Sequence, residues 1–394
     1  MMSKTVVLAY SGGLDTSVCV KWLTERGYRV VAFMANVGQG DPSAAAVTRA
    51  KIAGAASVVV KDVRQEFVSD YIWPALKANA VYEGKYVLAT ALSRPLIAKH
   101  LVDVAHAVKA TAVAHGCTGK GNDQVRFEVT ARILDPRLQI IAPVREWEFR
   151  SRDQEIDYAK RHRIPIDVTK RSPYSIDQNL WGTSIEAGVL EHPWIEPPSD
   201  TYRSIRAPER ATSKPGYVTI DFTRGTPTGL NGTRLSGVRL IKRLSAIGAQ
   251  HGIGRADMME SRVVGIKSRE VYESPAGAIL LEAHQELERL VLDRLLLQFK
   301  QGMSAKYAEL VYSGLWFTPL KRSLDVFVDE TQRRVTGRVR VKLYKGSCQA
   351  VGRQSPHSLY RERLATYSAK DQFDQRHAEG FIKLFGLAYE GSPT

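Results

Sequence analysis

Short apolar runs alternate with stretches of helical periodicity over the first part of the chain, up to about residue 165. An uninterrupted apolar run of about four to eight residues is typical of a strand buried on both faces of a parallel sheet. Such runs predict strands at Thr5–Tyr10, Tyr28–Ala35, Ser57–Val63, Thr111–His115 and Gln139–Val144. Because helices separate these strands, we expect an α/β fold with a doubly wound parallel sheet, whose ligands bind at the carboxyl ends of the strands.

Three helices are predicted between these strands. The first runs from Thr16 to Arg26 and stops at Gly27, a residue type common at helix C-termini. Asp41-Pro42 is typical of an N-cap followed by proline at the first helical position, and it predicts a helix that continues to about Ala55. A third helix is expected near Asp123–Leu134.

The pattern changes after Pro165, which predicts a second domain of α+β type. Prolines recur as far as Pro208 while helical periodicity fades, so we interpret this stretch as a long crossing segment. Tyr217–Phe222 alternates like a half-exposed strand. Asp325–Asp329 and Val335–Leu343 flank a short polar turn and predict a hairpin. One face of this hairpin is basic, with Arg338, Arg340 and Lys342.

Two further helices are predicted toward the C-terminus. Ser274-Pro275 opens a helical pattern that reaches about Lys300, and a last helix is expected at about Lys370–Leu387. The last helix has an apolar stripe made of Phe373, Phe381, Ile382 and Phe385. This stripe needs an apolar surface to cover it, either on this chain or on a partner subunit.

Composition excludes several classes of protein. The chain has 394 residues, of which 44% are hydrophobic and 25% are charged, as in an ordinary globular protein. No apolar run approaches the ~20 residues that span a bilayer, and Thr5–Tyr10 is too short for a secretory signal, so we expect no membrane partner. Cys19, Cys117 and Cys348 are far apart, which argues against disulfides and structural zinc and predicts a reducing, cytoplasmic location.

The net charge is the one unusual figure. Lys and Arg number 56 and Asp and Glu number 41, which gives a net charge of +15. Such an excess predicts an anionic partner, and nucleic acids, nucleotides and carboxylate substrates are all anions. The charge alone does not choose between them.

The segment Ser11–Ser17, with the sequence Ser-Gly-Gly-Leu-Asp-Thr-Ser, follows the first predicted strand and begins the first predicted helix. Its glycines let backbone N–H groups approach a ligand, and the helix adds unpaired N–H groups and the positive end of its dipole. Together these features predict a phosphate site. Asp15 would repel phosphate, unless it holds Mg²⁺ directly or through water. The sequence has neither the P-loop pattern nor the glycine pattern of dinucleotide-binding folds.

The same segment resembles the pyrophosphate-binding loop of the ATP pyrophosphatases, and the longer string Leu8–Ser17 resembles the argininosuccinate synthases in particular. Other segments resemble the same family and occur in its order: His115–Arg126, Tyr174–Leu180, Glu186–Gly188, Gly252–Asp257 and Val271–Gly277. The resemblance therefore covers nearly the whole chain. It implies ligation of citrulline and aspartate to argininosuccinate, with ATP as co-substrate, Mg²⁺, and release of AMP and pyrophosphate through a citrullyl-adenylate.

The resemblance also implies the residues of three subsites. For ATP they are Ala9, Tyr10, Ser11, Gly12, Gly13, Leu14, Asp15, Thr16, Ser17, Ala35 and Gly116. For citrulline they are Tyr86, Asn122, Arg126, Ser175, Ser184, Glu260 and Tyr272. For aspartate they are Thr118, Asn122 and Asp123.

The chemistry of these residue types fits their implied roles. Arg126 can bind a carboxylate with two parallel hydrogen bonds, and Glu260 can accept from an ammonium group. We expect Asp15 and Asp123 to be the catalytic carboxylates, with Asp123 the one candidate for a general base. Ala91 stands where many family members have serine, so a hydroxyl contact to citrulline is either missing or supplied by a neighbour such as Thr90. Thr90 and Arg94 are expected near the substrate.

The resemblance implies the domain organisation and a homotetramer. We expect a nucleotide-binding domain at 1–168, a synthetase domain with citrulline, aspartate and multimerisation contacts at 169–365, and a C-terminal oligomerisation helix at 366–394. A tRNA-thiolating pyrophosphatase is the alternative enzyme, which the net charge favours and the dispersed cysteines oppose. The extensive second domain with its matching segments, and Asp15, count against a non-enzymatic nucleotide-binding module. No nucleic-acid-binding motif is present, which counts against a nucleic-acid-binding protein, and we expect no nucleic-acid partner.

Overall fold

The computed structural model describes residues 4–40, 44–165 and 174–391. The predicted helix start at Asp41-Pro42 and the predicted domain boundary at residues 168 and 169 lie outside the described residues.

The N-terminal part contains a five-stranded parallel sheet with the strand order β3-β2-β1-β4-β5. Its strands are β1 (Thr5–Ala9), β2 (Arg29–Asn36), β3 (Ser57–Asp62), β4 (Ala112–Ala114) and β5 (Gln139–Ile141). All five predicted strands are therefore present. The last is shorter than predicted, because Pro143 begins a helical turn, α7 (Pro143–Glu146).

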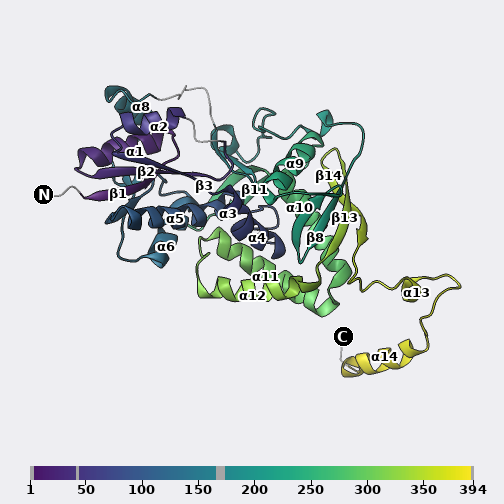
Figure 1. Cartoon of the computed structure of the whole chain (residues 1–394). Coiled ribbons are helices and arrows are strands. Elements are labelled where there is room, and N and C mark those ends of the chain that lie inside the picture. The colour runs from purple at the N-terminus through teal and green to yellow at the C-terminus, as the bar shows by residue number, and fades with distance from the viewer. Residues whose placement is uncertain (1–3, 41–43, 166–173, 392–394) are drawn as a thin grey trace.

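Helices cover both faces of this sheet (Figure 1). They are α1 (Leu14–Glu25), α2 (Ala44–Ile52), α5 (Ala89–Ala107), α6 (Asn122–Leu134) and α8 (Arg152–Arg161). Successive residues of β1 point to opposite faces, so Val7 belongs to the core that contains Leu92 of α5, while Val6 and Leu8 belong to the core that contains Val18 of α1. Burial on both faces explains why β1 has an unbroken apolar run.

Two antiparallel sheets make up most of the rest of the chain. One has the order β10-β9-β8-β13-β14 and the other β11-β12-β7-β6. The strands are β6 (Ser175–Gln178), β7 (Thr183–Glu186), β8 (Gly216–Thr223), β9 (Thr226–Leu230), β10 (Thr233–Arg234), β11 (Arg255–Ser261), β12 (Lys267–Glu273), β13 (Gly337–Tyr344) and β14 (Ser347–Gln354). The predicted fold class, a parallel α/β sheet joined to a second α+β part with a C-terminal helix, is confirmed.

The helices of this second part are α9 (Gly237–Gln250), α10 (Pro275–Val291), α11 (Arg294–Tyr312), α12 (Pro319–Thr331), α13 (Glu362–Ala365) and α14 (His377–Gly386). Short helices also connect the two parts and the loops: α3 (Arg64–Glu66), η1 (Phe67–Ile72), α4 (Trp73–Lys77), η2 (Gly188–Glu191), η3 (Pro208–Arg210), η4 (Gln332–Arg334) and η5 (Leu387–Tyr389). None of the helices among the described residues is long and apolar enough to cross a membrane.

The predicted hairpin is half wrong. Asp325–Asp329 is helical, inside α12, where Leu324 and Val328 are buried one turn apart. Val335–Leu343 does contain a strand, β13, but its hairpin partner is the following strand β14, and its other neighbour is β8. The short polar turn before Val335 is therefore a helix end rather than a hairpin turn.

The predicted helix from Ser274 to Lys300 is two helices. The first ends at Val291, and Asp293 begins the second, because its side chain accepts hydrogen bonds from the backbone N–H groups of Leu295 and Leu296 at 3.0 and 3.1 Å. Such a side-chain cap favours a new helix start over continuation. The predicted crossing segment after Pro165 also contains more structure than expected, since β6 and β7 form an antiparallel hairpin within it.

The C-terminal helix begins later than predicted, at His377, and lies at the end of an extended arm away from the body of the molecule (Figure 1). The apolar side chains of its stripe remain exposed, with Phe381 at 64% and Phe385 at 68% exposure. Among the described residues, this chain therefore does not bury the stripe.

Candidate functional site

A cavity of about 740 Å³ lies between the carboxyl edge of the parallel sheet and the sheet β11-β12-β7-β6. Its lining comes from the β1–α1 and β4–α6 loops on one side and from β6, β7, β11 and β12 on the other. All the residues predicted for the three subsites line it, except Gly12 and Ser17.

The β1–α1 loop brings the N-terminus of α1 to the cavity. Gly12 has φ of +85°, and a Cβ at this position would lie 2.9 Å from the Cβ of Ala46, so the tight turn requires glycine. Gly13 is the N-cap of α1 and contributes no side-chain hydrogen bond to it. The first N–H groups of α1 therefore remain available to an anion, at the positive end of the helix dipole.

The hydroxyl groups of this loop divide into two sets. The Ser11 and Thr16 hydroxyls lie 3.1 Å apart at the cavity wall. The Ser17 hydroxyl donates to the Gly13 carbonyl at 2.7 Å and lies 3.0 Å from the Tyr10 hydroxyl. Ser17 thus stabilises the loop on the side away from the cavity, whereas Ser11 and Thr16 can face a ligand.

Asp15 has a carboxylate neighbour that the sequence analysis missed, Glu155 of α8. Burial and the neighbouring Asp15 carboxylate raise the pKa of Glu155 to about 8. The Glu155 Oε2 atom is buried and has no hydrogen-bond partner among the described residues. Two adjacent carboxylates beside a phosphate-type loop are chemically suited to a hard cation such as Mg²⁺, although the described residues hold no cluster of three or more metal-binding side chains.

The two residues predicted near the nucleotide lie at strand ends. Ala35 is the second-to-last residue of β2, and its carbonyl accepts a hydrogen bond from Gln39 Nε2 at 2.7 Å. Gly116 follows β4. Both positions are at the carboxyl edge of the parallel sheet, where ligands of doubly wound folds bind.

Asp123, at the start of α6, is bound by two arginines. Its Oδ2 accepts from Arg94 Nε at 2.8 Å and its Oδ1 accepts from Arg126 Nη1 at 2.9 Å. Burial would raise the pKa of the Asp123 carboxyl, but the two guanidinium groups hold it below its usual value. A carboxylate with a lowered pKa is a weak base, so this environment suits binding of a cation better than removal of a proton. Arg94 also contacts Asp177 of β6.

Arg126 is buried, and one of its guanidinium nitrogens has no hydrogen-bond partner among the described residues. Its Nε donates to the Tyr312 carbonyl at 2.9 Å and its Nη1 to Asp123, whereas Nη2 has no hydrogen-bond partner among the described residues. An unpaired buried guanidinium nitrogen is costly. Because Arg126 lines the cavity, a ligand carboxylate there would satisfy Nη2.

The sheet β11-β12-β7-β6 presents one face to the cavity. Tyr272 of β12 pairs with Ser184 of β7, and Ser184 pairs with Asp177 of β6. Side chains two positions apart in a strand share a face. Each of three predicted residues therefore has a charged neighbour on the cavity wall that the sequence analysis did not select. These pairs are Ser175 with Asp177, Ser184 with Glu186, and Tyr272 with Glu270.

Two tyrosine hydroxyls bind Glu260 in this wall: Tyr272 also lines the cavity, whereas Tyr312 does not. The Glu260 carboxylate accepts from the Tyr272 hydroxyl at 2.5 Å and from the Tyr312 hydroxyl at 2.7 Å. The Tyr272 ring stacks on Tyr86 with 4.1 Å between centroids. The Tyr86 hydroxyl accepts from the backbone N–H groups of Thr90 and Ala91 at 2.9 and 3.2 Å, so it is committed to the start of α5.

Thr90, rather than Ala91, brings a hydroxyl to the cavity at this helix start. Thr90 lines the cavity, and its Oγ1 lies 2.8 Å from Ser184 Oγ. Ala91 is fully buried and does not line the cavity. The expectation that Thr90 could supply the missing hydroxyl is therefore consistent with its position.

The β4–α6 loop is held by a buried histidine. His115 Nδ1 accepts from the Cys117 backbone N–H at 3.2 Å, and His115 Nε2 lies 3.1 Å from Glu128 Oε1. Thr118 is exposed in this loop, at the cavity mouth. Burial raises the pKa of the Cys117 thiol, so it stays protonated near neutral pH and is unsuited to act as a nucleophile.

Arg262 connects two carboxylates that the sequence analysis missed. It contacts Glu186 and donates to Glu270 Oε1 at 2.6 Å. Burial, together with Glu186 and Glu260, raises the pKa of Glu270 to about 9. Glu186 and Glu270 could have been found from the sequence, because they lie two positions from the predicted strand residues Ser184 and Tyr272. No local feature of the sequence points to Arg262.

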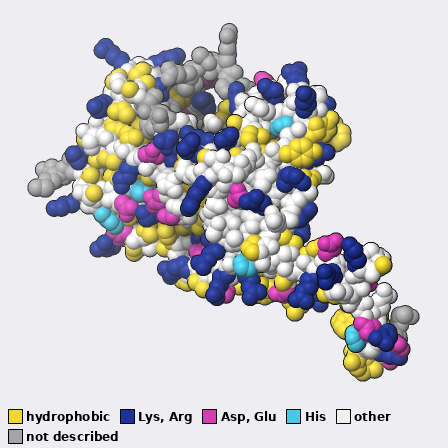
Figure 2. Space-filling model, turned by 45° about the vertical axis from the view of Figure 1, so that its right-hand side comes forward, with side chains coloured by type: hydrophobic (Ala, Val, Ile, Leu, Met, Phe, Trp, Pro, Cys, Tyr) yellow, Lys and Arg dark blue, Asp and Glu magenta, His cyan; other side chains and the backbone are white. Residues whose placement is uncertain are grey.

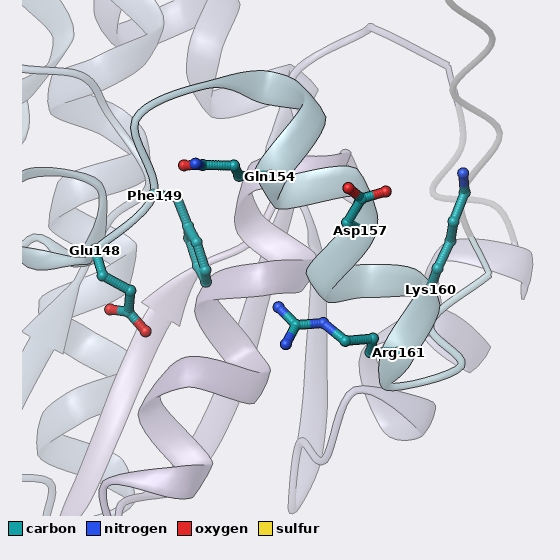
Figure 3. Close-up of a pocket in the computed structure, with 6 residues that line it drawn as sticks. All are labelled: Glu148, Phe149, Gln154, Asp157, Lys160 and Arg161. Atoms are coloured by element: carbon teal, nitrogen blue, oxygen red, sulfur yellow. The ribbon is translucent and has the colours of Figure 1, made fainter.

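A second hollow, of about 670 Å³, lies along α8 (Figure 3). Its lining residues are Glu148, Phe149, Gln154, Asp157, Lys160 and Arg161. None of the predicted site residues belongs to it, so the larger cavity is the candidate site.

Two family models match the chain. Residues 5–165 match "Arginosuccinate synthase N-terminal HUP domain", and residues 174–391 match "Arginosuccinate synthase C-terminal domain". Two proteins called argininosuccinate synthase are among the similar relatives. The one from Carboxydothermus hydrogenoformans is 55% identical over 98% of this chain and 96% of its own length, and the one from Rubrobacter xylanophilus is 56% identical over 98% and 94%.

Similarity to solved structures is much weaker. A 4-thiouridine synthetase–RNA complex with bound ATP has 18% identity and a TM-score of 0.30, covering 40% of this chain and 40% of that one. A predicted tRNA methyltransferase subunit from Methanocaldococcus jannaschii has 18% identity and a TM-score of 0.28, covering 40% of this chain and 75% of that one. Neither similarity is close enough to support an argument about function.

The Glu270 environment predicts a pH dependence of stability. The folded chain keeps Glu270 protonated up to about pH 9, whereas in the unfolded chain it ionises near its ordinary value of 4.5. The folded state therefore binds more protons between these values, and this contribution to stability is lost as pH rises from about 5 to 9. In Glu270→Gln, which stays uncharged, the melting temperature should fall less over this range than in the wild type.

Thermal unfolding followed by circular dichroism at several pH values measures this difference. Glu191→Gln, at an exposed carboxylate, is the matched control and should keep the wild-type pH dependence. Identical pH profiles for Glu270→Gln and the wild type would contradict the assignment.

Proposed function

The chain belongs to the argininosuccinate synthase family, and we propose that this cavity joins citrulline to aspartate with ATP, giving argininosuccinate, AMP and pyrophosphate in arginine biosynthesis. The observation that carries this proposal is that one cavity contains both an anion-binding helix start and a buried arginine with a free nitrogen. The first suits a polyphosphate and the second suits an amino-acid carboxylate.

The ATP phosphates are assigned to the β1–α1 loop. The first N–H groups of α1 and the hydroxyls of Ser11 and Thr16 would bind the phosphates that leave as pyrophosphate. Gly12 and Ser17 act indirectly, because they stabilise the conformation of the loop without lining the cavity. Ala35 and Gly116 would border the nucleoside at the sheet edge.

Mg²⁺ fits the carboxylates beside this loop. Asp15 is exposed at the helix start, and the partnerless Glu155 oxygen next to it is the kind of atom that a cation would satisfy. We assign Asp15 as the direct or water-mediated ligand and Glu155 as its neighbour in the same site. When bound, the cation would neutralise charge that develops on the departing pyrophosphate.

Aspartate is assigned to the β4–α6 loop. Thr118 offers a hydroxyl, and Asp123 offers a carboxylate held in the charged state by Arg94 and Arg126. An ionised carboxylate can orient the α-ammonium of aspartate before the amine reacts. We therefore assign Asp123 a binding role and no longer favour it as the general base.

Citrulline is assigned to the space between α6 and the sheet β11-β12-β7-β6. Arg126 Nη2 would bind its carboxylate, and the Glu260 carboxylate would face its ammonium group. Ser175, Ser184 and Thr90 supply hydroxyls for a neutral polar group. Tyr86 contributes a ring face to the wall, because its hydroxyl is already bound to α5.

The protein then contributes to the reaction by positioning the substrates rather than by covalent catalysis. The ureido oxygen of citrulline attacks the α-phosphorus, the bond to the β-phosphate oxygen breaks, and pyrophosphate leaves toward the start of α1. The amine of aspartate attacks the activated carbon, a C–N bond forms, and the C–O bond to AMP breaks. Cys117 is the only cysteine lining the cavity among the described residues, and its raised pKa makes it unsuited as a nucleophile. Alignment and charge stabilisation supply the catalysis.

Release of pyrophosphate from ATP is the experiment that tests this function. The purified chain should release pyrophosphate only when citrulline is present, because the ureido oxygen is the attacking group. Addition of tRNA should leave the rate unchanged. Release without citrulline, or stimulation by tRNA, would contradict the proposal, and the second outcome would favour the tRNA-thiolating alternative.

We further assign residues 1–168 to nucleotide binding, 169–365 to the amino-acid substrates and subunit contacts, and 366–394 to oligomerisation, in a cytoplasmic homotetramer. The exposed stripe of α14 supports the last assignment, since Phe381, Ile382 and Phe385 are each more than half exposed. An apolar helix face of this kind is stabilised by burial against another subunit.

Substitution of the stripe tests the assignment of α14. Phe381→Ser combined with Phe385→Ser should lower the mass in solution, measured by light scattering after gel filtration, because apolar burial between subunits is lost. Glu379→Gln combined with Lys383→Gln changes the ion pair on the same helix and is the matched control. If both double variants keep the wild-type mass, α14 does not hold the subunits together.

A further inference from the structure

Tyr312 is the last residue of α11 and is 1% exposed. It does not line the cavity, yet it makes hydrogen bonds to three residues that do. We propose that Tyr312 is a positioning residue for the citrulline subsite, which holds Asn122, Arg126 and Glu260 in place from behind the cavity wall; this inference rests on the proposed function.

The hydroxyl group of Tyr312 connects two elements that are far apart in the sequence. It donates to Glu260 Oε1 of β11 at 2.7 Å and accepts from Asn122 Nδ2 of α6 at 2.7 Å. A hydroxyl has one proton to donate, and a carboxylate can only accept, so the direction of both bonds is fixed. Burial, reinforced by Glu260, raises the pKa of Tyr312, which keeps this proton on the hydroxyl.

The Asn122 amide is fixed at both ends as a result. Its Nδ2 donates to Tyr312, and its Oδ1 accepts from the Val263 backbone N–H at 2.9 Å. A free asparagine amide can flip and exchange its donor and acceptor. With Tyr312 and Val263 on opposite sides, only one orientation satisfies both partners.

The backbone of Tyr312 orients Arg126 in the same way. The Tyr312 carbonyl accepts from Arg126 Nε at 2.9 Å, and the guanidinium carbon lies 5.0 Å from the centre of the Tyr312 ring. Gly314 lets the chain turn away there, since it has φ of +74° and a Cβ would lie 2.7 Å from Arg126 Cα. These contacts use one side of the guanidinium and leave Nη2 without a partner among the described residues.

The Tyr312 ring is itself held rigidly. It stacks on Tyr82 with 3.6 Å between centroids and 6° between planes, and it meets the edge of Tyr86 at 86°. The hydroxyl is therefore placed by packing that does not depend on the hydroxyl. Removal of the oxygen alone should leave the ring in place, while Glu260 and Asn122 each lose a partner.

The consequence should be specific to one substrate. Glu260 would keep only the Tyr272 hydroxyl, and Asn122 would be free to reorient, so both would be misplaced for citrulline. None of these hydrogen bonds of Tyr312 reaches the phosphate loop, so ATP binding should be unaffected.

Tyr312→Phe tests the proposal, with Tyr307→Phe as its matched control. Tyr307 is buried on the same helix, and its hydroxyl donates to Asp325 Oδ1 at 2.9 Å, outside the cavity. Both variants should lower the melting temperature by similar amounts. Only Tyr312→Phe should raise the KM for citrulline, by about tenfold, with the KM for ATP unchanged within about twofold.

A double substitution gives a second, independent measurement. If Tyr312 acts through Glu260, its effect on the KM for citrulline should largely disappear in a Glu260→Gln background, because coupled residues are not additive. Equal KM values for Tyr312→Phe and Tyr307→Phe, a parallel rise in all KM values, or full additivity with Glu260→Gln would each overturn the proposal. Failure of the proposed function is distinguishable, since the wild-type chain would then show no citrulline-dependent release of pyrophosphate.

Discussion

The buried charge on the first turns of α6 is the constraint on which the rest of the site depends. Arg126 is buried and Asp123 is partly buried at the cavity wall; they pair with each other, and each also needs a partner from outside α6. Arg94 of α5 and the end of α11 provide them, and Arg94 in turn contacts Asp177 of β6. The site is therefore complete only when the parallel sheet and the second part of the chain pack together.

This constraint gives the cavity two chemically different ends. At the β1–α1 loop, backbone N–H groups and hydroxyls provide an environment for phosphates. At the other end, Arg126 and the carboxylates of β7, β11 and β12 provide one site for an anion and several for a cation. An α-amino acid carries both charges, and its two ends match this arrangement.

The net charge of +15 is explained only in small part by this site. Lys and Arg side chains are spread over the face seen in Figure 2 rather than gathered around one hollow. Arg338 and Arg340 of β13 are exposed, while Val339 and Val341, which alternate with them, are fully buried. Much of the excess charge therefore belongs to solvated surfaces, and the glycine loop is the stronger guide to function.

Local patterns in the sequence predicted the elements that local physics determines. The unbroken apolar runs identified the strands of the parallel sheet, and the glycines before α1 identified the anion-binding loop. Asp325–Asp329 was misread because a five-residue segment is too short to separate a strand from a helix. Tyr312 and Arg262 could not be found, because their roles depend on contacts with residues more than fifty positions away in the chain, such as Asn122 and Glu186. Glu186 and Glu270 could have been predicted, because each lies two positions from a predicted residue on the same strand face.

The central claim is that the cavity aligns the ureido oxygen of citrulline with the α-phosphorus of ATP. Citrulline labelled with ¹⁸O in its ureido group tests this claim most directly, with the products separated and analysed by mass spectrometry. The label should be recovered in AMP, because that oxygen becomes bonded to phosphorus before aspartate displaces it. Recovery of the label in pyrophosphate or in argininosuccinate, with none in AMP, would contradict the account.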